Sequence, residues 1–230
     1  MSFILIIPQT PAVSFLKNKM DVYDYGNTSA DIILLQPVDE HDLNTLDNEI
    51  SCIRENTDAD FGLLAFGIDD WNRELSPWEA PAVFGKNDFG AGAEDTLREI
   101  LKYCDTAKAC IIGGYSLAGL FALWSAYRTD VFSAVAAASP SVWFPGFYDL
   151  MEKSTILTGN VYLSLGDREE KAKNPVMATV GDRIRAAHAL LSDRGVNCCL
   201  EWNAGNHFRD ADIRTAKAFS WAIRNADKTA

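Results

Sequence analysis

Ser116 lies where a serine side chain can act as a nucleophile. It sits in Gly114-Tyr115-Ser116-Leu117-Ala118, between the apolar run 109–113 and a long apolar stretch that starts at Leu117. This order predicts a strand, a sharp turn and a buried helix. The residues two before and two after the serine are small, as a tight turn with close flanks requires. The turn would hold the hydroxyl at the amino end of the helix, whose dipole stabilises negative charge. The alternative interpretation is a serine that only caps a helix.

A serine nucleophile requires a base, and the sequence contains three histidines. His41 lies in a polar run and His188 within a predicted helix, so both are typical of surface positions. His207 follows the last predicted strand and precedes the last predicted helix. Because doubly wound sheets keep their sites in loops at the carboxyl ends of strands, His207 is the expected base. A loop histidine that only bonds locally is the alternative.

An acidic residue should orient the imidazole. The loop Gly166-Asp167-Arg168-Glu169-Glu170-Lys171 carries three carboxylates at the end of a predicted strand. Glu169 is the expected acid, and Asp167 and Glu170 stay open as competitors. The order Ser116, Glu169, His207 is the nucleophile–acid–base order of an α/β-hydrolase.

An oxyanion hole needs two backbone donors. The N–H of Leu117, directly after the serine, is expected to be one of them. The second should come from the loop that follows the strand 61–66. Ile68 is the first choice for this donor because it follows a glycine, and Trp71 is the second choice.

Short apolar runs alternate with amphipathic stretches along the chain. This pattern predicts an α/β protein with a mostly parallel central sheet of about eight strands, helices on both faces and no large cap domain. The expected strands are 3–7, 21–25, 32–35, 61–66, 109–113, 134–138, 161–165 and 197–202. The expected helices are 43–55, 93–104, 117–127, 175–192 and 213–225. We expect residues 1–230 to form a single domain.

Two irregular segments, 69–92 and 139–147, are rich in aromatic residues and are expected to line an apolar substrate pocket. Trp71, Arg73 and Trp143 are the candidate substrate-binding residues in these segments. Arg73 could bind a carboxylate or a phosphate, or it could form a surface ion pair. Three scattered histidines and no Cys–His cluster provide no ligand set, so no metal or cofactor is expected.

Composition restricts the partners and the compartment. Lys and Arg number 21 and Asp and Glu number 32, which gives a net charge of −11. A surface with this much negative charge repels phosphate groups, which argues against nucleic acid or an anionic membrane as a partner. The five cysteines form no Cys-x-x-Cys pair and are expected to be reduced, which favours a cytoplasmic protein. The apolar run at 3–7 is too short for a signal peptide or a membrane helix. The oligomeric state stays open.

The sequence resembles a group of α/β-hydrolases, the putative esterase family, which includes esterase D-like and enterochelin esterase-like enzymes. The resemblance rests on the block 114–123, on Phe132-Ser133-Ala134-Val135 and on Ser139-Pro140-Ser141-Val142-Trp143. It extends to the segments 166–171 and 205–208 and covers about residues 60–225. It implies that Ser116 and His207 are catalytic and that Ser141 and Trp143 lie beside the pocket.

These observations lead to one expected function and two alternatives. The expected function is hydrolysis of small carboxylic esters by a Ser-His-acid triad through an acyl-enzyme. A thioesterase or a peptidase could use the same triad. A binding protein that keeps the fold without catalysis is the alternative from another class, and a His207 side chain turned away from Ser116 would favour it.

Overall fold

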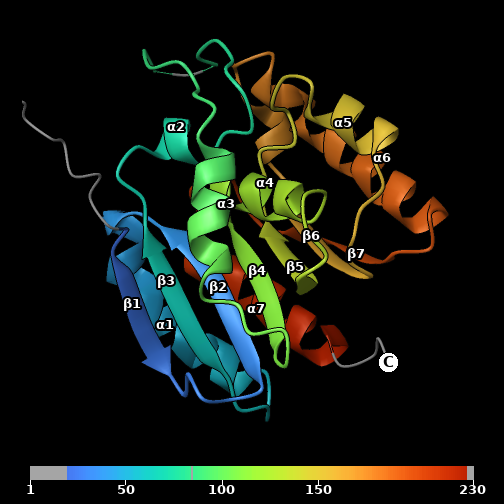
Figure 1. The fold of residues 1–230 in the computed structure, drawn as a ribbon. Coiled ribbons are helices and arrows are strands. Elements are labelled where there is room, and N and C mark those ends of the chain that lie inside the picture. Colours follow the sequence, from blue (N-terminus) through green and yellow to red (C-terminus); the bar gives the residue numbers. More distant parts are fainter. Residues whose placement is uncertain (1–19, 84, 227–230) are drawn as a thin grey trace, which may run out of the picture.

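The computed structural model describes residues 20–83 and 85–226, which contain one seven-stranded sheet (Figure 1). Its strand order is β1-β3-β2-β4-β5-β6-β7, and every neighbouring pair except β1 and β3 is parallel. The strands are β1 (Val22–Gly26), β2 (Ile32–Val38), β3 (Gly62–Gly67), β4 (Ala109–Tyr115), β5 (Phe132–Ala138), β6 (Asn160–Gly166) and β7 (Asn197–Asn203). Seven of the eight predicted strands are thereby confirmed, and the eighth, at 3–7, lies outside the described residues.

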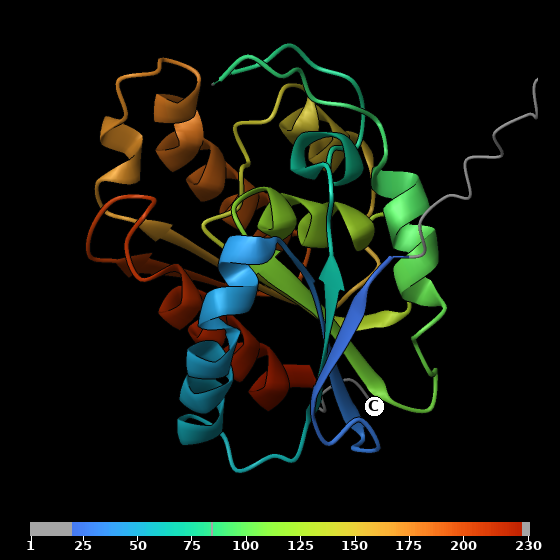
Figure 2. The ribbon, with the colours of Figure 1, turned by 90° about the vertical axis from the view of Figure 1, so that its left-hand side faces the viewer.

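Helices cover both faces of the sheet, as predicted. On one face lie α1 (Glu40–Glu55) and α7 (Ala211–Ala226). On the other face lie α3 (Ala93–Leu101), α4 (Leu117–Ser125), α5 (Phe147–Lys153) and α6 (Val180–Asp193). Figure 2 shows this arrangement, with α7 in red and α1 in blue on one side and α3 and α4 in green on the other.

Both faces of the sheet are apolar because its strands carry apolar residues at successive positions, and successive side chains of a strand point to opposite sides. In β2, Ile33 and Leu35 join the core under α3 and α4, while Ile32 and Leu34 join the core under α1 and α7. The adjacent Cys198 and Cys199 of β7 also divide between these two cores. The five cysteines carry free thiols in this structure.

Several helical segments differ from the sequence prediction. The predicted helix 175–192 begins only at Val180, after a single 3₁₀ turn at Met177–Thr179. The predicted helix 93–104 ends at Leu101. The segments predicted to be irregular contain the start of α5 and a one-turn helix, α2 (Trp71–Glu74). Such short helices have too few residues for apolar periodicity to reveal them.

Among residues 20–83 and 85–226, no helix is both long and apolar enough to cross a membrane. Within the same ranges, no group of three or more histidine, cysteine or acidic side chains is arranged to hold a metal ion.

Candidate active site

The turn between β4 and α4 has a strained backbone. Ser116 has φ 57° and ψ −116°, a conformation that residues other than glycine seldom adopt. Its N–H donates to the carbonyl of Ala138 at 3.0 Å, and its carbonyl accepts from the N–H of Ser141 at 3.0 Å. The ends of β4 and β5 therefore hold the strained turn in place.

The small residues around Ser116 follow from this geometry. A Cβ added to Gly114 would lie 2.7 Å from the Cβ of Ala118, and Gly114 also has φ +158°. A Cβ on Gly119 would lie 2.9 Å from the carbonyl oxygen of Gly114. The backbone of α4 thus packs directly on the end of β4, and larger side chains at these positions would force the two apart.

The side chains of Ser116, His207 and Glu169 form one hydrogen-bonded line. His207 Nε2 lies 2.9 Å from Ser116 Oγ, and His207 Nδ1 lies 2.7 Å from Glu169 Oε2. A carboxylate can only accept, so Nδ1 carries the hydrogen and Nε2 accepts from the serine hydroxyl. The three residues predicted as nucleophile, base and acid are thus brought together, and His207 points toward Ser116.

Glu169 is buried, with 7% of its surface exposed, in the 3₁₀ turn Glu169–Lys171 that follows β6. Its second oxygen, Oε1, accepts from the Gly166 N–H at 2.7 Å and from the Ser139 hydroxyl at 2.9 Å. Burial by itself would raise the pKa of Glu169. The hydrogen bond and charge of His207, with the Gly166 and Ser139 donors, outweigh burial and hold this pKa below its ordinary value. Glu169 is therefore ionised at neutral pH.

The two competing carboxylates contact other groups. Asp167 Oδ1 accepts from the N–H of Gly205 at 2.8 Å and so ties the acid loop to the histidine loop. Glu170 pairs with Arg185 at 2.7 Å on the surface. Of the three carboxylates in this loop, Glu169 is the one that reaches His207.

The backbone donors expected for an oxyanion differ in their availability. Leu117 begins α4, and within the described residues its N–H has no acceptor. Ile68 cannot fill the second place, because its N–H donates to the carbonyl of Val38 at 2.9 Å. The first-choice prediction of Ile68 is therefore wrong. Trp71, the second choice, begins α2, and its N–H also lacks an acceptor in the described part of the chain.

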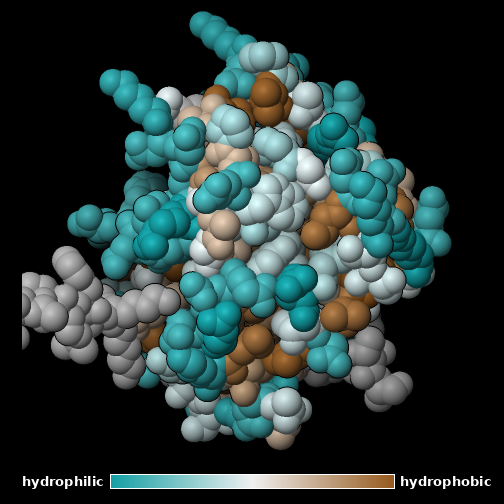
Figure 3. All heavy atoms as spheres, turned by 45° about the horizontal axis from the view of Figure 1, so that its top comes forward, coloured by the Kyte–Doolittle hydropathy of each residue, from teal (hydrophilic) through white to brown (hydrophobic). Residues whose placement is uncertain are grey.

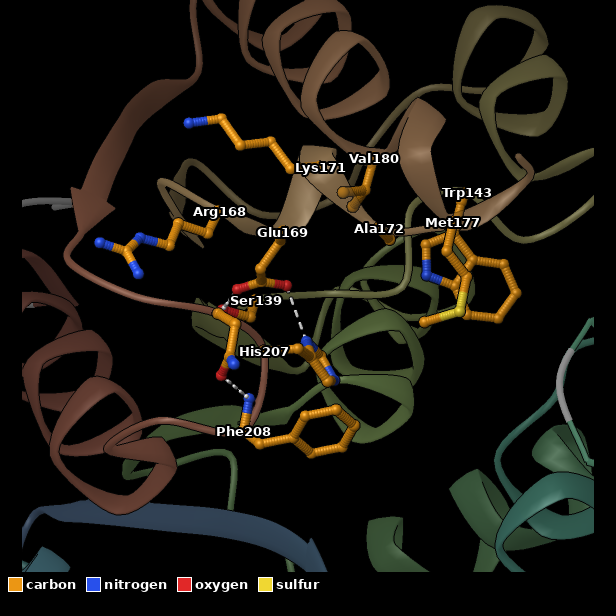
Figure 4. Close-up of a pocket in the computed structure, with 11 residues that line it drawn as sticks. Ser139, Trp143, Arg168, Glu169, Lys171, Ala172, Met177, Val180, His207 and Phe208 are labelled. Carbon is orange, nitrogen blue, oxygen red and sulfur yellow. Dashed lines mark hydrogen bonds and ion pairs between the residues drawn. The ribbon is translucent and has the colours of Figure 1, made fainter. Parts of the chain in front are cut away.

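A cavity of about 230 Å³ lies beside His207 and Glu169 (Figure 4). Trp143 and Met177 form one side of it, and the ring of Phe208 lies on the other side of His207. Arg168 and Lys171 belong to its rim, but their charged ends point away from His207. The side of the cavity formed by Trp143 and Met177 is apolar, and Ser139 and Trp143 come from the predicted segment 139–147. No residue of the segment 69–92 lines this cavity, so that part of the pocket prediction is wrong.

Trp143 is the one predicted substrate-binding residue among those that line the cavity. Trp71 does not line it, and its side chain packs against the core. The side chain of Arg73 is 63% exposed and pairs with Glu74 at 2.7 Å and with Asp70 at 3.4 Å. Arg73 thus forms the surface ion pairs that were its alternative interpretation, and it is not among the residues that line this cavity.

The structure adds residues that the sequence analysis did not single out. Arg214 is 2% exposed and pairs with Glu169 Oε1 at 3.0 Å. Tyr115 donates its hydroxyl to the carbonyl of His207 at 2.7 Å. Burial first, and then the Glu169 charge, raise the pKa of Tyr115 to about 12, so it stays protonated. The Ser141 hydroxyl, implied by the resemblance to lie nearby, is 3.3 Å from Ser116 Oγ.

No protein-family model and no curated protein matches the chain. Among solved structures, an IroE-like serine hydrolase from Shewanella oneidensis superposes with a TM-score of 0.70 at 14% identity, covering 92% of this chain and 77% of that one. The siderophore hydrolase EstB from Aspergillus nidulans superposes with a TM-score of 0.62 at 16% identity, over 96% and 99% of the two chains. The Bacillus cereus carboxylesterase gives 0.60 at 16% identity, over 91% and 96%.

These likenesses define the class of structure to which the chain belongs. It has the α/β-hydrolase fold, in the form found in esterases and siderophore hydrolases. The fold that the sequence resemblance implied is therefore confirmed. At such low identity the likeness extends to the fold and not to the reaction.

Proposed function

We propose that this protein is a serine hydrolase that cleaves carboxylic esters. The observation that supports this most strongly is the unbroken line from Ser116 Oγ through both nitrogens of His207 to Glu169, at 2.9 and 2.7 Å. The strained turn at Ser116 is the second support, because strain of this kind persists where the surrounding structure enforces it. A serine that only caps a helix would need neither feature.

In the proposed reaction, Ser116 Oγ attacks the acyl carbon and His207 Nε2 takes its proton. The N–H groups of Leu117 and Trp71 receive the negative charge of the carbonyl oxygen. The C–O bond to the alcohol then breaks, and the leaving alkoxide takes the proton from His207. Water next attacks the acyl-enzyme with His207 as the base, which releases the acid and restores Ser116. Throughout, Glu169 holds the Nδ1–H and stabilises the imidazolium.

The cavity suggests what the substrate carries next to the ester. Its apolar lining consists of Trp143, Ala172, Met177, Val180 and Phe208. The Glu169 carboxylate is taken up by its hydrogen bonds, and the charged ends of Arg168 and Lys171 point away from His207. Phe208 is 88% exposed, so an apolar group could contact both the cavity and its rim. Figure 3 shows the same end of the molecule, where brown apolar side chains interrupt a largely teal surface. We therefore propose an uncharged, apolar substituent on the substrate.

A kinetic panel tests this proposal. p-Nitrophenyl esters with acyl groups of increasing length, matched thioesters and an anionic acyl ester are compared on wild type and Ser116→Ala. Wild type should hydrolyse the uncharged esters, and Ser116→Ala should lose turnover by a factor of about 10⁶. Activity that survives in Ser116→Ala would overturn the proposed nucleophile. A clear preference for thioesters would redefine the substrate class.

The role of the cavity has its own matched pair of variants. Met177 lines the cavity, whereas its neighbour Val176 is 40% exposed and does not. Met177→Ala should raise KM for longer acyl groups, and Val176→Ala should leave KM unchanged. Equal effects of the two variants would contradict the proposed binding place.

A further inference from the structure

Arg214 is an unusual residue for the core of this protein. It lies in the first turns of α7, is 2% exposed and is among the largest buried side chains of the part of the chain that the structure describes. A buried guanidinium is costly unless every donor is paired. The hydrogen-bond partners of the Arg214 guanidinium therefore indicate why an arginine is buried here.

The two terminal nitrogens of Arg214 face different parts of the site. Nη1 lies 3.0 Å from Glu169 Oε1, 3.0 Å from the Tyr115 hydroxyl and 3.4 Å from the Ser139 hydroxyl. Nη2 donates to the carbonyls of Ala204 at 3.2 Å and Asn206 at 3.0 Å. One side chain thus contacts the acid, the residue before the nucleophile and the loop that carries the histidine.

The two carboxylate oxygens of Glu169 have different hydrogen-bond partners. Oε1 is engaged by Gly166, Ser139 and Arg214, so Oε2 is the oxygen that remains for His207. The fixed planar fork of arginine suits this task, because it can bind a carboxylate and two carbonyls at set angles. Lysine has a single point charge and cannot reach all of these acceptors from one position.

We propose that Arg214 is a positioning residue for the triad. It holds Glu169 and the loop that carries His207 in a fixed position relative to each other, and it offsets part of the negative charge of Glu169. This inference rests on the proposed hydrolase function. Arg214 does not line the cavity, so it acts through Glu169 and His207 and not on the substrate.

Removing the Arg214 side chain should affect both kcat and the pH dependence of kcat/KM. Loss of the fork should let Glu169 and His207 drift, and a misplacement of about 1 Å lowers kcat by about 100-fold. Loss of the positive charge at 3.0 Å should also make Glu169 easier to protonate, which moves the acidic limb of the kcat/KM profile to higher pH. The other groups facing Glu169 are His207 and Tyr115, and Tyr115 does not titrate in this range.

The test compares Arg214→Met and Arg214→Lys with Ile223→Ala. Ile223 is buried in the same helix, nine residues further along, so its truncation loosens α7 without contacting the site. All rates are expressed per active site titrated with a fluorophosphonate, which removes differences in folded fraction. Arg214→Met should have a lower kcat than wild type, an unchanged KM and an acidic limb of the kcat/KM profile that lies at higher pH. Arg214→Lys should keep the wild-type limb with a lowered kcat, and Ile223→Ala should match wild type in both.

Other outcomes are equally informative. If Arg214→Met matches Ile223→Ala in kcat and in pH profile, Arg214 is only structural and the inference is wrong. If Arg214→Met fails to fold, Arg214→Lys decides the question, and a wild-type kcat in that variant overturns the inference. If wild type itself neither reacts with the fluorophosphonate nor hydrolyses esters, the proposed function fails, which is a separate result.

Discussion

Replacing Glu169 by glutamine changes one atom of the site, and the structure fixes how the new amide must lie. Three donors meet at Oε1, from Gly166, Ser139 and Arg214. An NH₂ group cannot replace an acceptor there, so the amide oxygen must take the Oε1 position. The NH₂ group then faces His207 Nδ1 in place of Oε2.

This orientation forces the wrong tautomer on the histidine. An amide NH₂ donates to Nδ1, so the ring hydrogen moves to Nε2, which can then no longer accept the Ser116 proton. A comparable carboxylate-to-amide change in a Ser-His-Asp triad lowers kcat by about 10⁴, and we expect a loss of similar size here. Arg214 also loses the negative charge that it faces at 3.0 Å, which should cost roughly 3 kcal/mol of unfolding free energy.

The assay is p-nitrophenyl ester hydrolysis at neutral pH, with urea unfolding measured in parallel. Asp167→Asn and Glu170→Gln are the matched controls, because they change the two neighbouring carboxylates that do not contact His207. Both controls should stay within a few-fold of wild type. A Glu169→Gln variant with more than about a tenth of wild-type kcat, or an equal loss in Asp167→Asn, would show that Glu169 does not set the tautomer of His207.

Three further predictions concern the turn, the opposite face of the sheet and the surface. Gly114→Ala should lower the unfolding free energy by about 1–3 kcal/mol in urea unfolding, because its Cβ would lie 2.7 Å from the Cβ of Ala118; an unchanged midpoint would contradict this packing. Burial raises the pKa of Glu49 well above its ordinary value, so wild type should lose stability as pH rises from the ordinary carboxyl range toward neutral. Glu49→Gln should remove that loss and pair with Gln36, whose Oε1 lacks a partner among the described residues; stability curves of equal pH slope would count against it. Arg73→Ala should leave KM for an uncharged ester unchanged, and a several-fold rise would restore Arg73 as a substrate-binding residue.

The sequence predicts the nucleophile turn well because the requirement is local. The strand, the small residues around Ser116 and the apolar helix lie within about fifteen consecutive positions. The sequence does not decide among Asp167, Glu169 and Glu170, because all three follow the same strand. Only the fold shows that Glu169 turns inward while Asp167 binds the N–H of Gly205.

The errors and omissions concern contacts between distant segments. Whether the Ile68 N–H is available depends on the carbonyl of Val38 in a neighbouring strand, which no local pattern encodes. Arg214 lies in an amphipathic helix, where an arginine is normally a surface residue. Its burial follows from the approach of α7 to the acid and histidine loops, and no local pattern of residues indicates that approach. The segment 69–92 is predicted to be irregular, but Trp71 and Arg73 lie in the one-turn helix α2. Trp71 packs against the core and Arg73 is exposed to solvent, so neither residue lines the cavity.

The reactivity of Ser116 is the most direct test of the central claim. A fluorophosphonate forms a covalent adduct with a serine that has an activated hydroxyl, and the adduct can be assigned to a residue by mass spectrometry of the digested protein. We expect one adduct per chain, on the peptide that contains Ser116, and none in Ser116→Ala or after blocking with an ester that acylates the enzyme. A wild-type protein that stays unlabelled, or that is labelled on another residue such as Ser141, would contradict this expectation.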